Sequence, residues 1–368
     1  MTGPDPQPGI MDIAAYVGGE SKIDGVSRII KLSSNEGAFG PSPKAVEAAR
    51  GAAADMHRYP DGGATALRHA LADHHGLDAE RIVCGAGSDE VLSLLCSAYA
   101  GQGDEVLHSE HGFLMYAISA KAAGATPVAA PERNLTVDVD AMLAKVSDRT
   151  RIVFVANPNN PTGTCIPSAD IERLWQGLPD HVLLVIDAAY AEFVTDPEYS
   201  AGNDLVDRAE NVVMTRTFSK LYSLGGARLG WGYCPANVAD VLNRIRGPFN
   251  VNASALAMGL AAINDQEFAN MVRSETSRIR DDVTAELHKL QITTTNSAGN
   301  FILMNPGSGA GRDAEACDAF LKKHGVIVRR VGGYGLPDYL RVTVGTEEEM
   351  SVFLELVKKF MAGEGASS

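Results

Sequence analysis

The chain has 368 residues, 45% of them hydrophobic, which is enough for about two domains with sizeable cores. The formal net charge of −14 argues against nucleic acid or an anionic membrane as the main partner. Five scattered cysteines without a CxxC pair indicate reduced thiols and predict neither a metal site nor a disulfide framework. The N-terminus has no signal-peptide pattern and the longest apolar runs are strand-sized, so we expect a cytoplasmic protein.

In the first two thirds of the chain, apolar runs typical of strands alternate with amphipathic runs typical of helices. Continuous apolar strands separated by helices are typical of an α/β fold with a mostly parallel sheet covered on both faces. The strands are predicted at residues 81–86, 104–110, 151–156, 181–190 and 211–220, and the helices at 88–100, 139–146 and 168–178.

The pattern changes after Asn264. Residues 265–290 place Phe268, Val272, Ile279, Val283 and Leu287 at helical spacing, which predicts a long amphipathic helix capped by Asn264 or Asp265. Short strands at 293–297, 300–304, 326–331 and 339–344 follow, and a terminal helix closes the chain. We therefore expect a large domain at 45–264 and a smaller α+β domain at 265–368, with residues 1–44 packing on the smaller domain.

Residues that could bind a ligand or take part in catalysis follow several of the predicted strands. In an open α/β sheet, ligands gather at the carboxyl ends of the strands, so these residues should meet. Each of them alone has an ordinary structural explanation, such as a turn, a helix cap or a core aromatic ring. In chain order they are Gly85–Glu90, Phe113, the turn 157–163 (NPNNPTG), Asp187 with Tyr190, and Ser219-Lys220 with Arg228.

One ligand accounts for all of these residues together. An aromatic cation with a phosphate arm needs a carboxylate for its ring nitrogen, hydrogen bonds for its ring oxygen, a stacking ring and an anion cradle. If it also carries an aldehyde, it needs a lysine. Pyridoxal 5′-phosphate (PLP) has all of these features.

The motifs NPNNPTG, DAAY, TFSK with GARLGW, and LRVTVGTEEE resemble those of the fold-type I PLP-dependent aminotransferases. Within that family, SSNE with GPSPKA, HRYPDGG, GAGSDE and GYGLPDYLRVTVG are similar to the histidinol-phosphate aminotransferases. The resemblance runs from about Pro8 to the C-terminal helix. It implies transfer of the amino group of L-histidinol phosphate to 2-oxoglutarate, giving imidazole acetol phosphate and glutamate in histidine biosynthesis.

The resemblance assigns roles to individual residues. Lys220 would carry PLP and act as general base and acid. Asp187 would pair with the ring nitrogen, Asn160 and Tyr190 would bond the ring oxygen, and Phe113 would stack on the ring. The phosphate would be held by Ser88, Asp89, Thr217, Ser219 and Arg228. The resemblance also implies a cis Asn160–Pro161 bond.

For the substrate, the resemblance implies binding by Arg341 and Arg329, with Asn35 and Tyr16 at the mouth of the site. Arg329 and Arg341 lie on successive predicted strands and would face one cavity, which suits a phosphate better than a carboxylate. Tyr59 matches a tyrosine that reaches the phosphate of the neighbouring subunit, which implies a homodimer with shared active sites.

Three stretches depart from the family pattern. Gly37-Ala38 replaces Asn-Pro, Ala188 replaces Glu, and His111-Gly112 replaces Pro-Thr. The first of these lies near the substrate mouth and leaves the amino donor open. An aromatic amino acid aminotransferase and a PLP-dependent threonine-phosphate decarboxylase are the enzymatic alternatives. An effector domain of a transcription regulator would need a DNA-binding segment, for which the acidic composition is unsuited.

Overall fold

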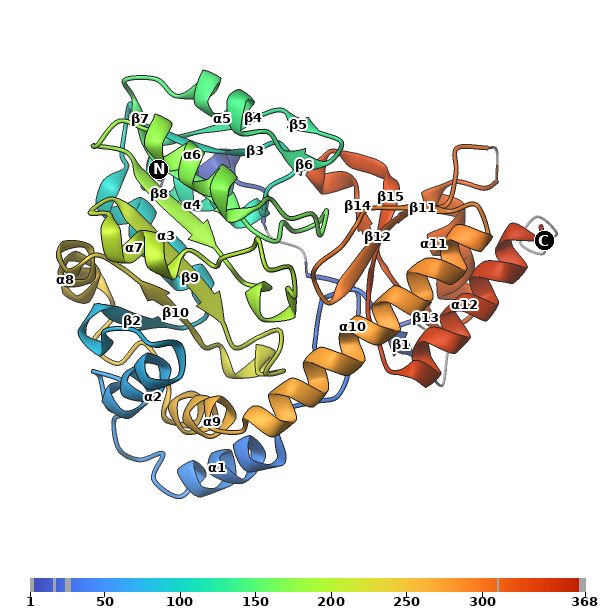
Figure 1. Ribbon diagram of the computed structural model, residues 1–368, viewed down its shortest axis with the longest axis horizontal. Coiled ribbons are helices and arrows are strands. Elements are labelled where there is room, and N and C mark those ends of the chain that lie inside the picture. The colour runs from blue at the N-terminus through green and yellow to red at the C-terminus, as the bar shows by residue number, and fades with distance from the viewer. Residues whose placement is uncertain (1–2, 16–17, 24–27, 310, 364–368) are drawn as a thin grey trace.

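The computed structural model describes residues 3–15, 18–23, 28–309 and 311–363. Its larger part is built on a seven-stranded sheet (Figure 1), which confirms the predicted α/β class. Six strands run parallel, and β10 alone pairs antiparallel with both of its neighbours. The spatial order is β2 (Ile82–Gly85), β10 (Gly230–Tyr233), β9 (Val212–Thr217), β8 (Leu183–Asp187), β7 (Thr150–Ala156), β3 (Glu105–Ser109) and β4 (Thr126–Ala130).

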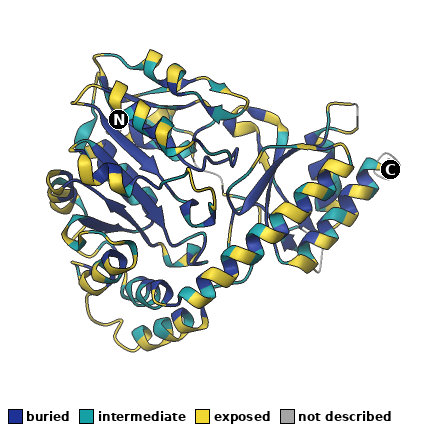
Figure 2. Cartoon of the chain, viewed as in Figure 1, coloured by how far each residue is buried: buried dark blue, intermediate teal, exposed yellow. Residues whose placement is uncertain are grey.

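Helices cover both faces of this sheet, because alternate strand residues point to opposite sides. Val153 and Val155 pack into one core, while Ile152 and Phe154 pack into the other. The first core is shared with α1 (Pro43–Ala53), α2 (Thr65–His75), α5 (Val139–Lys145), α6 (Ser168–Gly177), α7 (Asn203–Arg208) and α9 (Ala253–Ile263). The second is shared with α3 (Ser88–Tyr99), α4 (Leu114–Ala122) and α8 (Ala236–Ile245). The sheet strands are accordingly largely buried, except for the edge strand β4, which is mostly exposed or half-buried (Figure 2).

A second, four-stranded antiparallel sheet has its own hydrophobic core. Its spatial order is β11 (Thr293–Thr294), β12 (Phe301–Asn305), β15 (Leu336–Thr343) and β14 (Arg329–Val331), and its helices are α10 (Gln266–Lys289), α11 (Ala314–Lys323) and α12 (Glu347–Met361). The prediction of a single strand at 326–331 is wrong. Its first part, β13 (Val326–Ile327), pairs with β1 (Ile30–Lys31), and only β14 joins the four-stranded sheet. The domain boundaries at 44 and 264 stay a prediction.

Helix α10 links the two cores (Figure 1). Ala269 and Val272 near its start belong to the core of the large sheet, whereas Ile279, Val283 and Leu287 belong to the core of the small one. Asp265 occupies the N-cap position, as predicted, but its side chain does not cap the helix. Its carboxylate instead accepts hydrogen bonds from Ser42 Oγ at 2.5 Å and Lys44 Nζ at 2.7 Å, which ties α10 to the start of α1.

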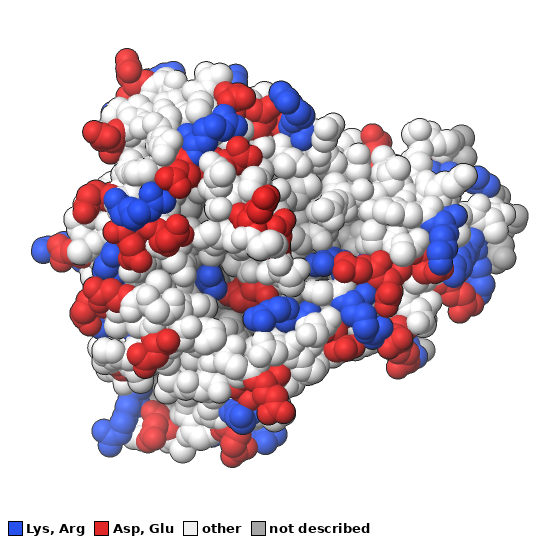
Figure 3. Space-filling view, viewed as in Figure 1, with Lys and Arg blue, Asp and Glu red and all other residues white. Residues whose placement is uncertain are grey.

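A short hairpin and several 3₁₀ turns complete the set of elements. A hairpin of β5 (Glu132–Arg133) and β6 (Thr136–Val137) follows β4, and short 3₁₀ turns occur at Ile10–Asp12, Ala79–Arg81, Ala191–Phe193, Gly225–Ala227 and Gly332–Tyr334 (η5). Among the described residues, none of the helices is long and apolar enough to cross a membrane. Acidic and basic side chains are interspersed over the face seen in Figure 3.

Candidate active site

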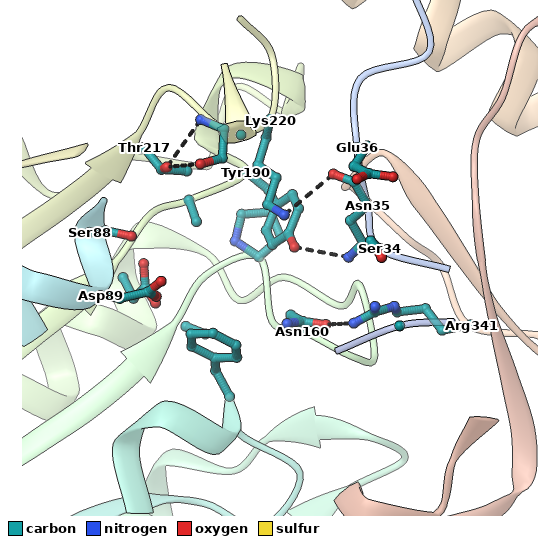
Figure 4. Close-up of a pocket in the computed structure, with 18 of the residues that line it drawn as sticks. Ser34, Asn35, Glu36, Ser88, Asp89, Asn160, Tyr190, Thr217, Lys220 and Arg341 are labelled. Atoms are coloured by element: carbon teal, nitrogen blue, oxygen red, sulfur yellow. Dashed lines mark hydrogen bonds between the residues drawn. The ribbon is translucent and has the colours of Figure 1, made fainter. Parts of the chain in front are cut away.

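A pocket of about 290 Å³ lies where the carboxyl ends of the large-sheet strands meet the N-terminal segment and the small sheet. Strands β7, β8 and β9 each contribute their last residue or those just after it, as expected for an open α/β sheet. Residues from β14, β15 and the stretch 33–36 close the opposite side (Figure 4).

Lys220 projects into this pocket three residues after the end of β9 (Figure 4). Its Nζ donates a hydrogen bond to the backbone carbonyl of Asn35 at 3.3 Å and lies 5.6 Å from the centre of the Tyr190 ring. Burial, and next the positive charge of Arg341, lower the pKa of the Lys220 ammonium to about 8. A substantial fraction of this amine is therefore neutral and nucleophilic near pH 8.

Asp187 is the last residue of β8 and is buried in the floor of the pocket. Its Oδ2 accepts a hydrogen bond from the Tyr116 hydroxyl at 2.8 Å, and its Oδ1 accepts one from Thr215 Oγ1 at 3.2 Å. Burial raises the pKa of the Asp187 carboxyl to about 6, although both hydrogen bonds lower it. Such a carboxylate is fixed in orientation and is suited to a cationic partner in the pocket.

The N-terminus of α3 forms one end of the pocket. Its N-cap is Gly87, so no side chain caps the first backbone N–H groups there, as an anion site requires. Gly87 has φ +87°, and a Cβ at this position would lie 2.4 Å from Nη2 of Arg228. Only glycine allows the guanidinium to approach this backbone so closely.

The groups around this helix end are mostly hydrogen-bond donors. Thr217 Oγ1 donates to Ser219 Oγ at 2.9 Å, which leaves the Ser219 hydroxyl hydrogen to point elsewhere. Arg228 Nη2 binds the Asp89 carboxylate at 3.0 Å. The resemblance did not imply this ion pair, and a phosphate at the helix end would share the guanidinium with Asp89.

At the other end of the pocket, Arg341 is buried on β15. Its Nη1 donates to Asn160 Oδ1 at 2.5 Å and its Nη2 donates to the Ser33 carbonyl at 3.0 Å, while the buried Nε has no hydrogen-bond partner. Arg329 is its direct cross-strand partner on β14 and also lines the pocket, with Nη1 on the Gly18 carbonyl at 3.0 Å. Both guanidinium groups thus face one cavity, as predicted.

Asn35 connects the two halves of the site. Its Nδ2 donates to the Tyr190 hydroxyl at 2.9 Å, and its backbone N–H donates to Thr343 Oγ1 at 2.8 Å. Its carbonyl accepts from both Lys220 and Asn300. The N-terminal segment is therefore part of the wall around Lys220 (Figure 4).

A family model described as aminotransferase class I and II matches residues 27–357. The chain belongs to this family. The histidinol-phosphate aminotransferase of Paramagnetospirillum magneticum is 60% identical over 98% of this chain and 99% of its own length. The enzyme of the same name from Rhodospirillum centenum is 56% identical over 99% of this chain and 100% of its own length.

Solved structures agree with this aminotransferase assignment. Histidinol-phosphate aminotransferase from Sinorhizobium meliloti, in complex with pyridoxal-5′-phosphate, superposes with a TM-score of 0.90 at 27% identity, covering 99% of each chain. Aspartate aminotransferase from Thermus thermophilus, at 23% identity and a TM-score of 0.80, covers 90% of this chain and 92% of its own and shares the fold.

The structure brings most of the predicted site residues of the aminotransferase into one pocket. These are Asn35, Ser88, Asp89, Phe113, Asn160, Asp187, Tyr190, Thr217, Ser219, Lys220, Arg228, Arg329 and Arg341. The Asn160–Pro161 bond is cis, as predicted, and Asn157–Pro158 is also cis, which was not predicted. Tyr59 does not line this pocket but lies on the surface, and Tyr16 is outside the described residues.

Sequence reasoning missed several residues of the aminotransferase site. Tyr116 was not singled out, because an aromatic residue in an apolar helix reads as core, and nothing in the sequence points to Asp187, 71 residues away. Thr215 sits inside a strand, where a threonine is ordinary. Tyr334 and Glu36 also line the pocket; both lie within the quoted motifs GYGLPDYLRVTVG and SSNE, but neither was assigned a role there.

Proposed function

We propose that this aminotransferase transfers the amino group of L-histidinol phosphate to 2-oxoglutarate, with PLP as cofactor. The choice of histidinol phosphate as the amino donor rests on Arg329 and Arg341. These two residues lie opposite each other on neighbouring strands and line the same pocket. The names of the relatives at 50–60% identity support the same donor and do not favour the aromatic or decarboxylase alternatives.

The residues present fit PLP. Its phosphate would lie at the uncapped N-terminus of α3, within reach of Ser219 and Arg228. Asp187 would hold the ring nitrogen, Tyr190 and Asn160 the ring oxygen, and Phe113 one face of the ring. When bound, PLP supplies an electron sink for the pair left behind when the bond from Cα of the donor to hydrogen breaks.

The residues of the chain supply the proton transfer and the orientation. The Lys220 amine, with its pKa lowered to about 8, is matched to taking and returning a proton near neutral pH. Asp187, held in orientation by hydrogen bonds from Tyr116 and Thr215, would supply the negative charge that a protonated ring nitrogen needs. Arg341 and Arg329 hold the anionic end of the donor, so that its Cα faces Lys220.

Replacing Arg329 with alanine should weaken turnover of histidinol phosphate more than turnover of phenylalanine. A phosphate has enough oxygens and charge for two guanidinium groups, whereas a carboxylate is satisfied by one. Loss of one charged hydrogen bond costs roughly 1.5–3 kcal/mol, so kcat/KM for histidinol phosphate should fall about 10- to 150-fold. The absorbance change of the amino-donor half-reaction measures this for each donor.

Arg330 provides the matched control, because it precedes the same turn but pairs with Glu315 at 3.7 Å and does not line the pocket. Arg330→Ala should leave both donors nearly unaffected. The same assay on the unmutated protein compares histidinol phosphate, phenylalanine, tyrosine and phosphothreonine. An equal loss for both donors, or phenylalanine as the better donor, would replace this proposal with an aromatic aminotransferase.

We further propose a homodimer with shared sites. Tyr59 is 82% exposed and stacks on Phe249 with ring centres 4.5 Å apart, and Met56 and Ile245 are also exposed. The exposed, stacked pair of Tyr59 and Phe249 supports an interface at this surface, because contiguous exposed apolar groups mark protein–protein contacts. Tyr59 is then available to reach the cofactor phosphate of the other subunit.

A cytoplasmic location also stays a prediction.

A mixture of Tyr59→Ala and Lys220→Ala subunits should regain activity that neither variant has alone. In a shared-site dimer, a mixed dimer contains one site with both native residues. After joint unfolding and refolding at equal concentration, about a quarter of the activity of the native protein is the most that random pairing allows. A fully active monomer in sedimentation would contradict the dimer.

A further inference from the structure

His111 connects the loop that precedes α4 to the small-sheet side of the pocket. The large domain already holds its backbone, because the His111 N–H donates to Glu132 Oε1 at 3.2 Å and Asn159 Nδ2 donates to its carbonyl at 3.4 Å. The ring reaches in the other direction. Its Nδ1 lies 2.7 Å from the carbonyl oxygen of Tyr334.

The turn that receives this ring is closely fitted to it. Tyr334 ends η5, and the next residue, Gly335, has φ +77°. A Cβ on Gly335 would lie 3.5 Å from both Nδ1 and Cε1 of His111, so the ring rests directly against this backbone. A carbonyl only accepts hydrogen bonds, so Nδ1 carries the hydrogen, in the neutral ring or the protonated one.

The same turn forms part of the pocket wall near Arg329, where the amino donor is proposed to bind. Tyr334 lines the pocket, and η5 directly follows β14, which holds Arg329. Tyr334 packs in a small cluster with Leu303, Val331 and Leu336, against which Leu114 of α4 rests. The loop of His111 also carries Phe113, which is proposed to stack on the cofactor ring. The hydrogen bond from His111 to the Tyr334 carbonyl therefore joins the Phe113 side of the pocket to the Arg329 side.

We propose that His111 is a positioning residue for the amino donor. By holding the Tyr334 carbonyl, it fixes η5 and so keeps the Tyr334 ring and Arg329 in place around the anionic end of the donor. The choice of histidinol phosphate as the donor rests on the proposed function, whereas the link between His111 and η5 does not.

Comparison of His111→Asn with His111→Leu tests this role, since the two side chains have nearly the same size and only asparagine keeps an N–H donor. For His111→Leu, KM for histidinol phosphate should rise about tenfold, with kcat changed less than about threefold. In the holoenzyme, amide hydrogen exchange across residues 332–336 should quicken about tenfold. His111→Asn should return both quantities to within about threefold of the native protein.

His324 provides a matched control. Its Nδ1 lies 2.8 Å from the carbonyl oxygen of Phe320, so its ring also contacts a backbone carbonyl, but His324 is the C-cap of α11 and does not line the pocket. His324→Leu should change neither KM nor exchange at residues 332–336. Should His111→Leu fail to fold, His111→Ala replaces it in the comparison.

Two results would overturn the proposal. One is an amide hydrogen-exchange rate at residues 332–336 of His111→Leu that equals that of the native protein. The other is an equal change in KM and in exchange rate for His111→Leu and His111→Asn. If the native protein does not turn over histidinol phosphate at all, the proposed function fails by itself. The exchange comparison between leucine and asparagine then still decides whether His111 fixes this turn.

Discussion

Replacing Lys220 with alanine should abolish turnover, with kcat reduced by at least about 10⁴-fold. The side chain is the only lysine amine among the described residues that lines the pocket, and burial lowers its pKa to about 8. No neighbouring group can replace it, because a guanidinium such as that of Arg341 has no acceptor site for a proton. Burial also raises the pKa of the Tyr190 hydroxyl to about 12. Steady-state assays with saturating cofactor measure the loss.

Borohydride reduction of the loaded enzyme followed by peptide mapping should place the cofactor on Lys220. Lys121 is the matched control, since its Nζ binds the Asp12 carbonyl at the surface and it lies outside the pocket. Lys121→Ala should keep full activity and the same label. Multiple turnovers by Lys220→Ala, or a label on another lysine, would contradict the assignment of Lys220.

Replacing Asp187 with asparagine should lower kcat by about 10²–10³-fold, the usual effect of removing one fixed electrostatic group from a site. Asparagine keeps the size of the side chain but loses the negative charge that faces the pocket. The loss should persist at saturating PLP, because it reflects the charge on the cofactor ring rather than occupancy. Single-turnover absorbance measurements separate the two.

We do not expect loss of stability to account for this fall in kcat, and the pH dependence of stability tests this point. Without cofactor, burial raises the pKa of Asp187 from 3.8 to about 6. A carboxyl with a raised pKa stabilises the fold when protonated, and this contribution is lost as pH rises through about 6. Above that pH, cofactor-free Asp187→Asn should therefore be more stable than the native protein, by up to roughly 3 kcal/mol.

Denaturant unfolding of the cofactor-free proteins at pH 5 and pH 8 measures this difference. Asp318 serves as the control, because it is also a buried carboxyl with a raised pKa but pairs with Lys322 within α11 and does not line the pocket. Asp318→Asn should leave kcat unchanged. A kcat for Asp187→Asn within about threefold of the native value would refute the role of the charge.

The parts of the fold that the sequence predicts are those with a strong local period. The strand ahead of Lys220 and the helix after Asp265 have continuous or 3.6-residue apolar patterns, and both appear where expected. The antiparallel direction of β10 has no such local signal, because strand direction depends on the path of the chain between elements. The division of residues 326–331 between two sheets also depends on distant partners, Ile30 in one case and Arg341 in the other.

The site divides in the same way. Lys220, Asp187 and Asn160 follow strands within motifs, so their meeting in one pocket follows from the topology of a parallel sheet. Tyr116 and His111 have no such signal. Each acts through a single hydrogen bond to a residue far along the chain, and only the three-dimensional structure shows which residue it meets.

The pairing of β1 with β13 has a consequence for synthesis of the chain. Ile30 meets Val326, about 300 residues later, so β1 lacks this partner strand until residues 326–327 have been made. At about 5–20 residues per second, this interval lasts roughly 15–60 seconds. During that time Ile30 and Leu32, both buried in the finished protein, are exposed to water and to other nascent chains. The core of the small sheet, and the wall that Asn35 builds around Lys220, therefore cannot be completed until residues 326–343 have left the ribosome.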